Sequence, residues 1–379
     1  MTIVQLGDVV QKILGNEDRL TTSLEYYVGG EHFTSGDLEI KQCGRIRDED
    51  LGYQFHFPFE AGDVLFMTKN PRLKKASRVN FDGICSIATF VIRTKSESFL
   101  LQDFLPIVVQ SNDFWDYLMA NQSGSVNPFI KWGTLEKYSF ELPDVHCQKK
   151  YCDVIWALQE SINLLEQQQL MLDSLIKSRF IEMFGTSANP KYGQVKIADL
   201  VSKDIKKVPK KYGLEDIIDY IDISSIDKES RSIVETTEYA VKDAPSRAQQ
   251  CVIEGDILLS NVRPNLKTLA IVNSSSNNLV CSTGFTVLRC KDSFPEYLTI
   301  AITDDYFTNK LVKKANGSNY PAVTSKDVYN SIIPSAPIEL QKQFATFVQQ
   351  VDKSKFELQK HLEDTKKLQK ALINQAFKQ

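Results

Sequence analysis

The most regular pattern of apolar and polar positions in the chain lies between Gln148 and Phe184. Apolar residues recur there at spacings of three and four, as in a coiled-coil seam, and the stretch contains no glycine or proline. Gly185 follows directly and gives a helix stop signal. The pattern therefore predicts one helix of roughly 55 Å, which is too long to lie inside a single compact domain.

The C-terminal end of the chain repeats this pattern. Gln341 and Phe377 align with Gln148 and Phe184 without a gap, and 193 positions separate the members of each pair. A second long helix is therefore expected. It buries its seam most simply by running back along the first helix, so we expect an antiparallel pair. The predicted seam residues are Ile155, Leu158, Ile162, Leu165, Leu172, Ile176, Val351, Leu358, Leu362 and Leu372.

The regions before the two helices are related more faintly, as diverged repeats are. Asp63 precedes an apolar run as Asp256 does, and Arg93 lies 196 positions before Arg289. Each region alternates short β-like runs with helical stretches, which is typical of a mixed α and β domain. The chain is therefore interpreted as two copies of one unit, a globular domain followed by a long helix.

These patterns predict an α+β protein in which two pseudo-symmetric mixed α/β domains are joined by two long antiparallel coiled-coil helices. The expected division is a first domain at residues 1–146, a first helix at 147–185, a second domain at 186–338 and a second helix at 339–379. Because each helix leads from one copy to the other, a single chain would present two similar but unequal surfaces, related by a pseudo-twofold axis.

The composition is that of a globular protein, and we expect the protein to remain in the cytoplasm. No apolar run reaches membrane-spanning length, and the N-terminus has no secretory apolar segment. The seven cysteines form no CxxC pair, so reduced thiols are expected. The four histidines are scattered, so no metal site is expected. A net charge of −3 gives no global indication of nucleic-acid binding.

Local charge is more informative than net charge. Between Asp63 and Asp82 every charged residue is basic, and the corresponding region of the second copy carries Arg263, Asn265 and Lys267. Arginine can read a guanine edge or clamp a phosphate, and lysine adds a point charge. One such cluster is usually a solvated loop, but recurrence in both copies favours a DNA contact. The candidates in the first copy are Lys69, Arg72, Lys74, Lys75 and Arg78.

A second pair of loops is rich in small residues. The stretch SGSVNPFIKW in the first copy corresponds to ANGSNYPAV in the second. Small residues with accessible backbone N–H groups suit close approach to a phosphate, although a plain surface loop before the last strand would look the same. The candidates for DNA contact are Ser123, Ser125, Asn127, Lys131, Lys314, Asn316, Ser318, Asn319 and Tyr320.

No catalytic constellation is apparent. The sequence has no GxxxxGK[ST] loop, no GxGxxG and no HExxH. Asn127-Pro-Phe129 is faintly similar to the box of amino-methyltransferases, but it lacks the second proline. We therefore expect no catalytic residue and no cofactor in this chain.

Several stretches together resemble one known family. They are GDILLSNVRPNLKTLAIV from Gly255, STGFTVLR from Ser282, GSNYPAVTSKDV from Gly317 and KSRFIEMFG from Lys177. With the two diverged halves and their long helices, the whole chain resembles the specificity subunit of type I restriction-modification enzymes. The first half departs more from the family pattern, because KNPRLKKASRV stands where a stretch closer to NVRPNLK is expected.

The resemblance implies a mechanism. Each globular half would be a target-recognition domain for one half of an asymmetric, bipartite DNA site, and the helices would set the spacer between the halves. Two methyltransferase subunits would dock on the helices and carry S-adenosylmethionine, and a restriction-translocase subunit is a further possible partner. This chain would supply specificity without chemistry.

Two alternatives from other classes stay open at this point. The first is a two-headed protein-protein scaffold with no DNA specificity. DNA binding should weaken steeply as salt rises, because counterions are released, whereas scaffold contacts need not. The second is a methyltransferase with its own recognition domain, against which the missing cofactor motif argues.

Overall fold

The computed structural model describes residues 2–227, 231–317 and 321–377. The chain divides into two compact units. The first comprises Met1–Gln167 with Leu358–Gln379, and the second comprises Gln168–Glu357. Each unit thus contains one globular domain and a part of each long helix. None of the helices in the described ranges is both long and apolar enough to cross a membrane.

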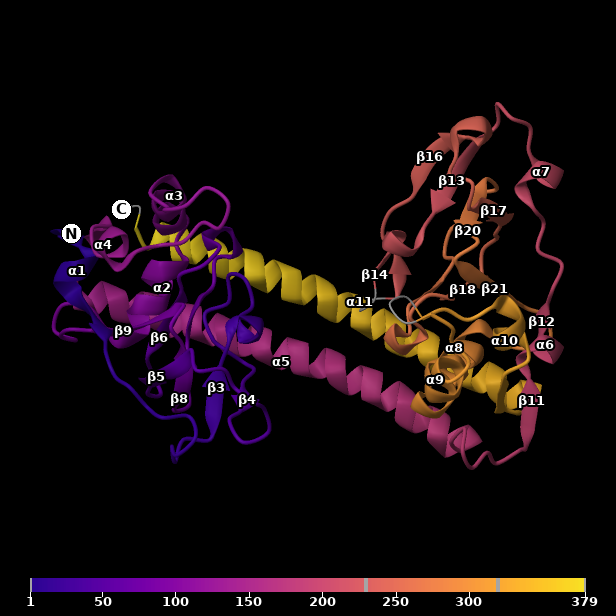
Figure 1. Ribbon diagram of the computed structural model, residues 1–379, viewed down its shortest axis with the longest axis horizontal. Coiled ribbons are helices and arrows are strands. Elements are labelled where there is room, and N and C mark those ends of the chain that lie inside the picture. The colour runs from indigo at the N-terminus through magenta and orange to yellow at the C-terminus, as the bar shows by residue number, and fades with distance from the viewer. Residues whose placement is uncertain (1, 228–230, 318–320, 378–379) are drawn as a thin grey trace. The chain divides into compact units, whose positions relative to one another are not determined.

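The first domain is built on two four-stranded sheets (Figure 1). One has the strand order β2-β9-β6-β7 and the other β4-β3-β8-β5. All neighbours are antiparallel except β3 and β8, which pair in parallel. The strands are β2 (Val10–Ile13), β3 (Tyr26–Val28), β4 (Gly44–Arg45), β5 (Phe55–Phe59), β6 (Val64–Met67), β7 (Ala76–Arg78), β8 (Gly83–Ser86) and β9 (Thr89–Thr94).

Short helices cover the first of these sheets. An aromatic cluster fills the space between them, in which Phe66 of the sheet stacks on Trp115 of α3 at 5.6 Å between ring centroids. The helices are α1 (Leu6–Val9), α2 (Leu105–Gln110), α3 (Asn112–Ala120) and α4 (Trp132–Leu135), with 3-10 turns η1 (Gly30–His32), η2 (Pro71–Leu73) and η3 (Gln102–Phe104). A two-stranded ladder of β1 (Thr2–Gln5) and β10 (Ser139–Leu142) closes the domain.

The second domain repeats this plan with the same strand order, β12-β21-β18-β19 and β16-β13-β20-β17. Here too one pair is parallel, β13 with β20. The strands are β12 (Val201–Ser202), β13 (Ile217–Ile221), β16 (Thr237–Ala240), β17 (Ala248–Cys251), β18 (Ile257–Ser260), β19 (Leu269–Ile271), β20 (Leu279–Ser282) and β21 (Phe285–Cys290). The predicted internal repeat is therefore confirmed at the level of sheet topology.

The remaining elements of the second domain also follow the first. The ladder of β11 (Gln194–Lys196) with β22 (Ile332–Pro334) corresponds to that of β1 with β10, and β14 (Ile226–Asp227) pairs with β15 (Ser232–Ile233). The helices are α6 (Ile197–Leu200), α7 (Val208–Lys211), α8 (Pro295–Thr303), α9 (Asp305–Val312) and α10 (Ser325–Tyr329), with η4 (Ile223–Ser225), η5 (Val241–Asp243) and η6 (Pro264–Leu266).

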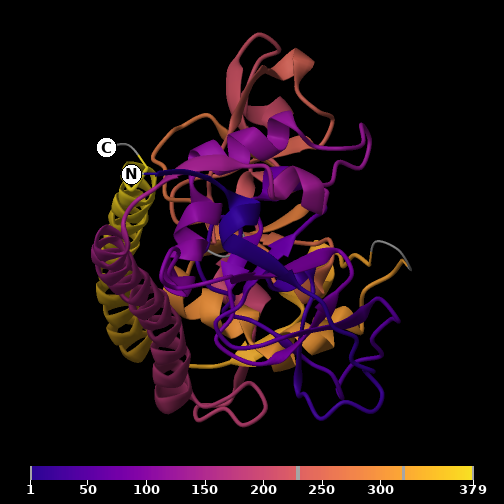
Figure 2. The same ribbon diagram turned by 90° about the vertical axis from the view of Figure 1, so that its left-hand side faces the viewer.

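The two predicted long helices are present as α5 (Val145–Phe184) and α11 (Ile338–Gln375). α5 begins at Val145 because Asp144 caps it, accepting a hydrogen bond from the Cys147 amide at 2.8 Å. That hydrogen bond lowers the pKa of the Asp144 carboxyl. Within each unit, the parts of the two helices lie side by side in both views (Figures 1 and 2).

Within each unit the helices pair antiparallel. In the first unit Gln369 and Lys366 of α11 contact Gln159 and Glu166 of α5, and in the second Lys355 and Phe344 of α11 contact Asp173 and Phe180 of α5. The residue numbers therefore fall on one helix as they rise on the other. Of the predicted seam residues, Ile155, Ile162, Ile176, Val351 and Leu362 are buried, and Leu158, Leu165, Leu172, Leu358 and Leu372 are half-buried.

Candidate nucleic-acid interface

A tight turn follows the second strand of the main sheet in each domain. In the first domain the turn after β6 holds Asn70 at φ 52° and Lys74 at φ 46°, with η2 between them. In the second domain the turn after β18 holds Arg263 at φ 50° and Lys267 at φ 51°, with η6 between them. Non-glycine residues rarely adopt this left-handed conformation, so its recurrence at two equivalent positions in both domains marks a defined structure and not a loose loop.

We call these segments the reading turns, residues 68–75 and 261–268. The counterpart of Asn261–Lys267 is Thr68–Lys74, one residue earlier than the stretch Lys69–Lys75 that sequence comparison indicated. The backbone angles fix the register, and with it the proline, leucine and lysine of TKNPRLK and NVRPNLK coincide at the same offset of 193 positions that relates the two helices.

The corrected register exchanges an arginine and an asparagine between the domains. Arg263 occupies the position of Asn70, and Asn265 occupies the position of Arg72. All four side chains are exposed. Arginine pairs bidentately with a guanine edge and asparagine with an adenine edge, so the two turns offer different base-reading groups on the same backbone.

The small-residue loops lie directly against the reading turns. The Asn70 amide donates to the carbonyl of Pro128 at 2.8 Å, and the Arg263 amide donates to the carbonyl of Pro321 at 2.7 Å. The Ile130 amide in turn donates to the Thr68 carbonyl at 2.9 Å. Sequence reasoning treated these stretches separately, but each domain joins them into one surface.

The loops, residues 121–130 and 314–323, are themselves closed by paired hydrogen bonds. Ser123 and Phe129 exchange two backbone hydrogen bonds of 2.9 Å, as Asn316 and Ala322 do. Gly124 has φ 85°, and a Cβ there would lie 2.9 Å from the Asn127 carbonyl oxygen, so a glycine is required. We call these segments the glycine loops.

Some of the predicted basic residues have partners within their own domain. Lys75 Nζ donates to the Gly30 carbonyl at 2.6 Å, and Lys267 pairs with Asp305, whose pKa that hydrogen bond lowers. Lys314 Nζ lies 3.4 Å from Ser331 Oγ. These lysines therefore hold the turns and loops in place as well as adding positive charge near them.

Arg78 differs from the other candidates. It pairs with Asp103 at 2.7 Å and lies 4.7 Å from the centre of the Trp156 ring, inside a groove that Glu39 and Asp153 also line. Carboxylates repel a phosphate backbone, so the proposed DNA contact of Arg78 is the one that its surroundings support least.

The remaining candidates are distributed over the reading turns and glycine loops. Lys69, Arg72, Ser125, Asn127, Lys131, Lys314 and Asn316 are exposed, and Lys74 and Ser123 are half-buried. Ser318, Asn319 and Tyr320 lie outside the described residues.

Sequence reasoning did not find the groups that support the reading turns. At the base of the strand that leads into each turn, a buried aspartate binds an arginine through two hydrogen bonds. Asp63 accepts from Arg93 at 2.7 and 2.9 Å, and Asp256 accepts from Arg289 at 2.9 and 2.7 Å. The repeat alignment had already matched Asp63 with Asp256 and Arg93 with Arg289. This recurrence was the signal in the sequence from which a contact between them could have been inferred.

At the other end of the strand, the second domain has a buried polar cluster below its turn. Thr286 Oγ1 lies 2.6 Å from Asn261 Oδ1 and 2.9 Å from Ser325 Oγ. The cluster joins the turn to the sheet and to α10. Nothing in the residue spacing indicated it, because its members lie 25 and 39 positions apart.

Comparison with known proteins agrees with this geometry. A family model described as the type I restriction modification DNA specificity domain matches residues 190–366. The type I restriction enzyme HindI specificity subunit of Haemophilus influenzae (strain ATCC 51907 / DSM 11121 / KW20 / Rd) is 28% identical over 131 residues, which are 33% of this chain and 28% of that subunit. Residues 190–366 are thus similar to the DNA specificity domain of type I restriction-modification systems, and the match spans less than a third of the length of that curated relative.

Solved structures share the fold of nearly the whole chain. A chain in a structure that addresses complex assembly and conformational transition of the type I R-M system matches with a TM-score of 0.54 at 22% identity, covering 99% of this chain and 97% of that one. The S subunit of a type I restriction-modification system from M. genitalium matches with a TM-score of 0.57 at 12% identity, covering 100% and 96%.

Proposed function

We propose that this chain is the DNA-recognition subunit of a type I restriction-modification complex. Each globular domain reads one half of an asymmetric, bipartite site, using its reading turn and glycine loop. The observation that carries the proposal is the reading turn, which has the same backbone in both domains but presents Asn70 in one and Arg263 in the other. A scaffold protein has no need of one backbone frame with different base-reading groups.

The surrounding lysines fit the non-specific part of binding. Lys69, Lys131 and Lys314 are exposed on or beside the turn-and-loop surfaces of the two domains. Contacts from such residues to phosphates position a protein on DNA without carrying sequence information, and they make affinity depend on salt. Sequence information is left to the arginine and asparagine side chains of the reading turns.

The long helices have two roles in this proposal. Their paired length sets the spacer between the half-sites, and their outward faces dock two methyltransferase subunits. Those subunits carry S-adenosylmethionine and methylate one adenine in each half-site, and a restriction-translocase subunit is a further partner. This chain contributes no catalytic group. It positions the methyltransferase subunits on the DNA site that it recognises.

Binding of duplex DNA by the chain, co-expressed with its methyltransferase partner, tests the proposal. Affinity for a duplex that contains the site should fall steeply between 50 and 200 mM salt, by a slope of about −0.9 in log K against log salt for each phosphate contacted. A shuffled duplex should bind more weakly at every salt concentration. Equal, salt-insensitive affinity for both duplexes would leave the two-headed scaffold as the better account.

A further inference from the structure

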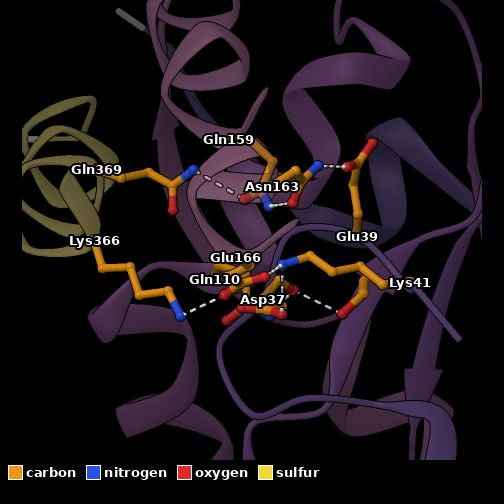
Figure 3. A network of polar contacts seen from close by, with 10 residues as sticks. Asp37, Glu39, Lys41, Gln110, Gln159, Asn163, Glu166, Lys366 and Gln369 are labelled. Atoms are coloured by element: carbon orange, nitrogen blue, oxygen red, sulfur yellow. Dashed lines mark hydrogen bonds and ion pairs between the residues drawn. The ribbon is translucent and has the colours of Figure 1, made fainter. Parts of the chain in front are cut away.

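A pair of glutamines interrupts the apolar packing of the two helices in the first unit. Gln159 of α5 is 2% exposed and Gln369 of α11 is 7% exposed. Gln369 Nε2 donates to Gln159 Oε1 at 3.0 Å and lies 3.4 Å from the Ile155 carbonyl oxygen (Figure 3). Buried amides lose hydrogen bonds to water, so each depends on the other for its partner.

The contact continues from the helices into the globular domain. Gln159 Nε2 donates to Asn163 Oδ1 at 3.0 Å, and Asn163 Nδ2 donates to Glu39 Oε2 at 3.0 Å (Figure 3). One turn further along, Glu166 accepts hydrogen bonds of 2.7 Å from Lys41 of the domain and from Lys366 of α11. Three segments of the chain therefore meet in one polar network.

The pKa shifts in this network favour the ionised forms of Glu166 and Lys41, which attract each other. Burial alone would raise the pKa of Glu166, but the hydrogen bonds from Lys366 and Lys41 outweigh it and lower that pKa. Burial alone would lower the pKa of Lys41, but the hydrogen bond to Glu166 and the charge of Asp37 outweigh it and raise that pKa. Both groups are thus ionised at neutral pH.

The same segment of the domain also reaches the reading turn. The Gly36 amide donates to the Lys74 carbonyl at 3.3 Å, and the Ile40 amide donates to the Arg78 carbonyl at 2.9 Å. Gln110 Nε2 donates to the Asp37 carbonyl at 3.2 Å and fixes the middle of the segment. Residues 36–41 therefore connect the helix pair to the turn that is proposed to read DNA.

The glutamine pair is not needed to fill the space between the helices. In the second unit the position equivalent to Gln369 is Ile176, which is 5% exposed and belongs to an apolar cluster. The position equivalent to Gln159 is Asp352, which is exposed, so the second unit has no buried amide pair at the matching place and the helices pack there without one. A polar residue buried in a helical seam commonly selects one register at some cost in stability, because any other register leaves it unpaired.

We propose that the contact between Gln159 and Gln369 fixes the register of the helix pair, and that the network through Asn163, Glu39 and Glu166 fixes the first reading turn to that register. Both glutamines are positioning residues that restrict the complex to one spacer length. This inference rests on the proposed function, because a spacer has meaning only if both domains bind DNA. The register itself, however, is measurable without DNA.

The test is the double variant Gln159→Met/Gln369→Met. Methionine has nearly the same length and shape as glutamine, and removing both partners leaves neither amide unpaired. The matched control is Leu362→Met, which changes a buried seam residue without a polar group. Helix content and melting temperature should be retained in both. Failure of the double variant to fold would overturn the proposal, because the pair would then be needed for packing itself.

Register is read first in the absence of DNA. Spin labels are placed on the exposed residues 161 and 367, after Cys43, Cys147 and Cys290 are changed to serine. Double electron–electron resonance should give one distance between the two spin labels for the wild type and for the control. The double variant should add a second distance, displaced by a slip of one helical turn, about 5 Å, or of one heptad, about 10 Å.

Spacer choice is read second, by sequencing methylated adenines in cells that carry each chain with its partner. The double variant should methylate the same half-sites at neighbouring spacers, whereas the control should keep one spacer. A single distance with either spacer result would overturn the inference. If the double variant shows a second distance but the wild type directs no methylation of a split site, the register role is supported and the proposed function is contradicted.

Discussion

Asn70 and Arg263 occupy the same position in the two halves of the chain. Both have φ close to 50°, and each donates its backbone amide to a proline carbonyl of the adjacent glycine loop, at 2.8 and 2.7 Å. The frame is common to both domains, but the side chain that it presents differs. Different half-site preferences are therefore expected to follow from side chains and not from different backbones.

Changing Arg263 to asparagine should remove the recognition of one base in the half-site that the second domain reads. Asparagine is the residue of the equivalent first-domain position, and it tolerates the left-handed backbone better than alanine would. The expected loss is about 1–3 kcal/mol for the matched base, if arginine makes a bidentate contact. Fluorescence anisotropy with duplexes altered in one half-site at a time measures it.

The matched control for that change is Arg72→Asn in the first domain. It should affect the other half-site and leave the Arg263 half-site unchanged. If both variants weakened one and the same half-site, the assignment of one half-site to each domain would be contradicted.

Changing Asp63 to asparagine should destabilise the first unit, because the Arg93 guanidinium then loses its buried carboxylate and keeps only the exposed Glu60 as a charged partner. Asp63 is 1% exposed and Arg93 is 34% exposed. The free energy of unfolding should therefore fall by an amount near the lower end of the range for a broken buried pair, about 3 kcal/mol. All three tryptophans of the chain lie before residue 157, so tryptophan fluorescence in urea follows this unit. Asp50→Asn, at an exposed position, should leave the transition unchanged.

Changing Glu166 to glutamine should make stability less dependent on pH in the acid range. The folded-state pKa of Glu166 is lowered, so its contribution is present above the unfolded pKa of about 4.3 and is lost as pH falls through the folded value. At pH 7 the variant should be less stable by about 1 kcal/mol, since the network is partly exposed. The difference should shrink below about pH 4, and a constant difference from pH 7 to 3 would contradict the ionised network.

Inserting four residues in α5 near Gln168 should change the preferred spacer or abolish binding, while each half-site keeps its sequence. The insertion lengthens the helix by about 6 Å and alters the facing of its two ends. An insertion of the same length between Ser274 and Ser275, in an exposed loop, is the control and should leave the spacer unchanged. An unchanged spacer after the helix insertion would refute the role of the helices as a ruler.

The sequence predicted the large features of the fold because they rest on repetition. Two helices with the same seam and two sets of related strands leave a signal across many residues, so an error at one position is averaged out. The aspartate and arginine of each buried pair could be matched between the halves, although their mutual contact could not.

Single positions were less predictable from the sequence. The one-residue error in the reading turns hid the exchange of Arg72 with Asn265, although the shared proline, leucine and lysine of the two turns carried the correct register. The contact of Gln159 with Gln369 joins residues 210 positions apart, and helical spacing alone does not distinguish a buried glutamine from an exposed one. The acidic groove around Arg78 likewise arises from residues that are distant in the chain.

Adenine methylation, mapped by single-molecule sequencing in the source cell with and without this gene, tests the central claim most directly. The account predicts that one split, asymmetric methylated motif disappears when the gene is removed and returns when it is restored. The Arg263→Asn chain should restore a motif altered in one half only. An unchanged set of methylated motifs, with the methyltransferase partner shown to be expressed, would contradict the role in DNA recognition.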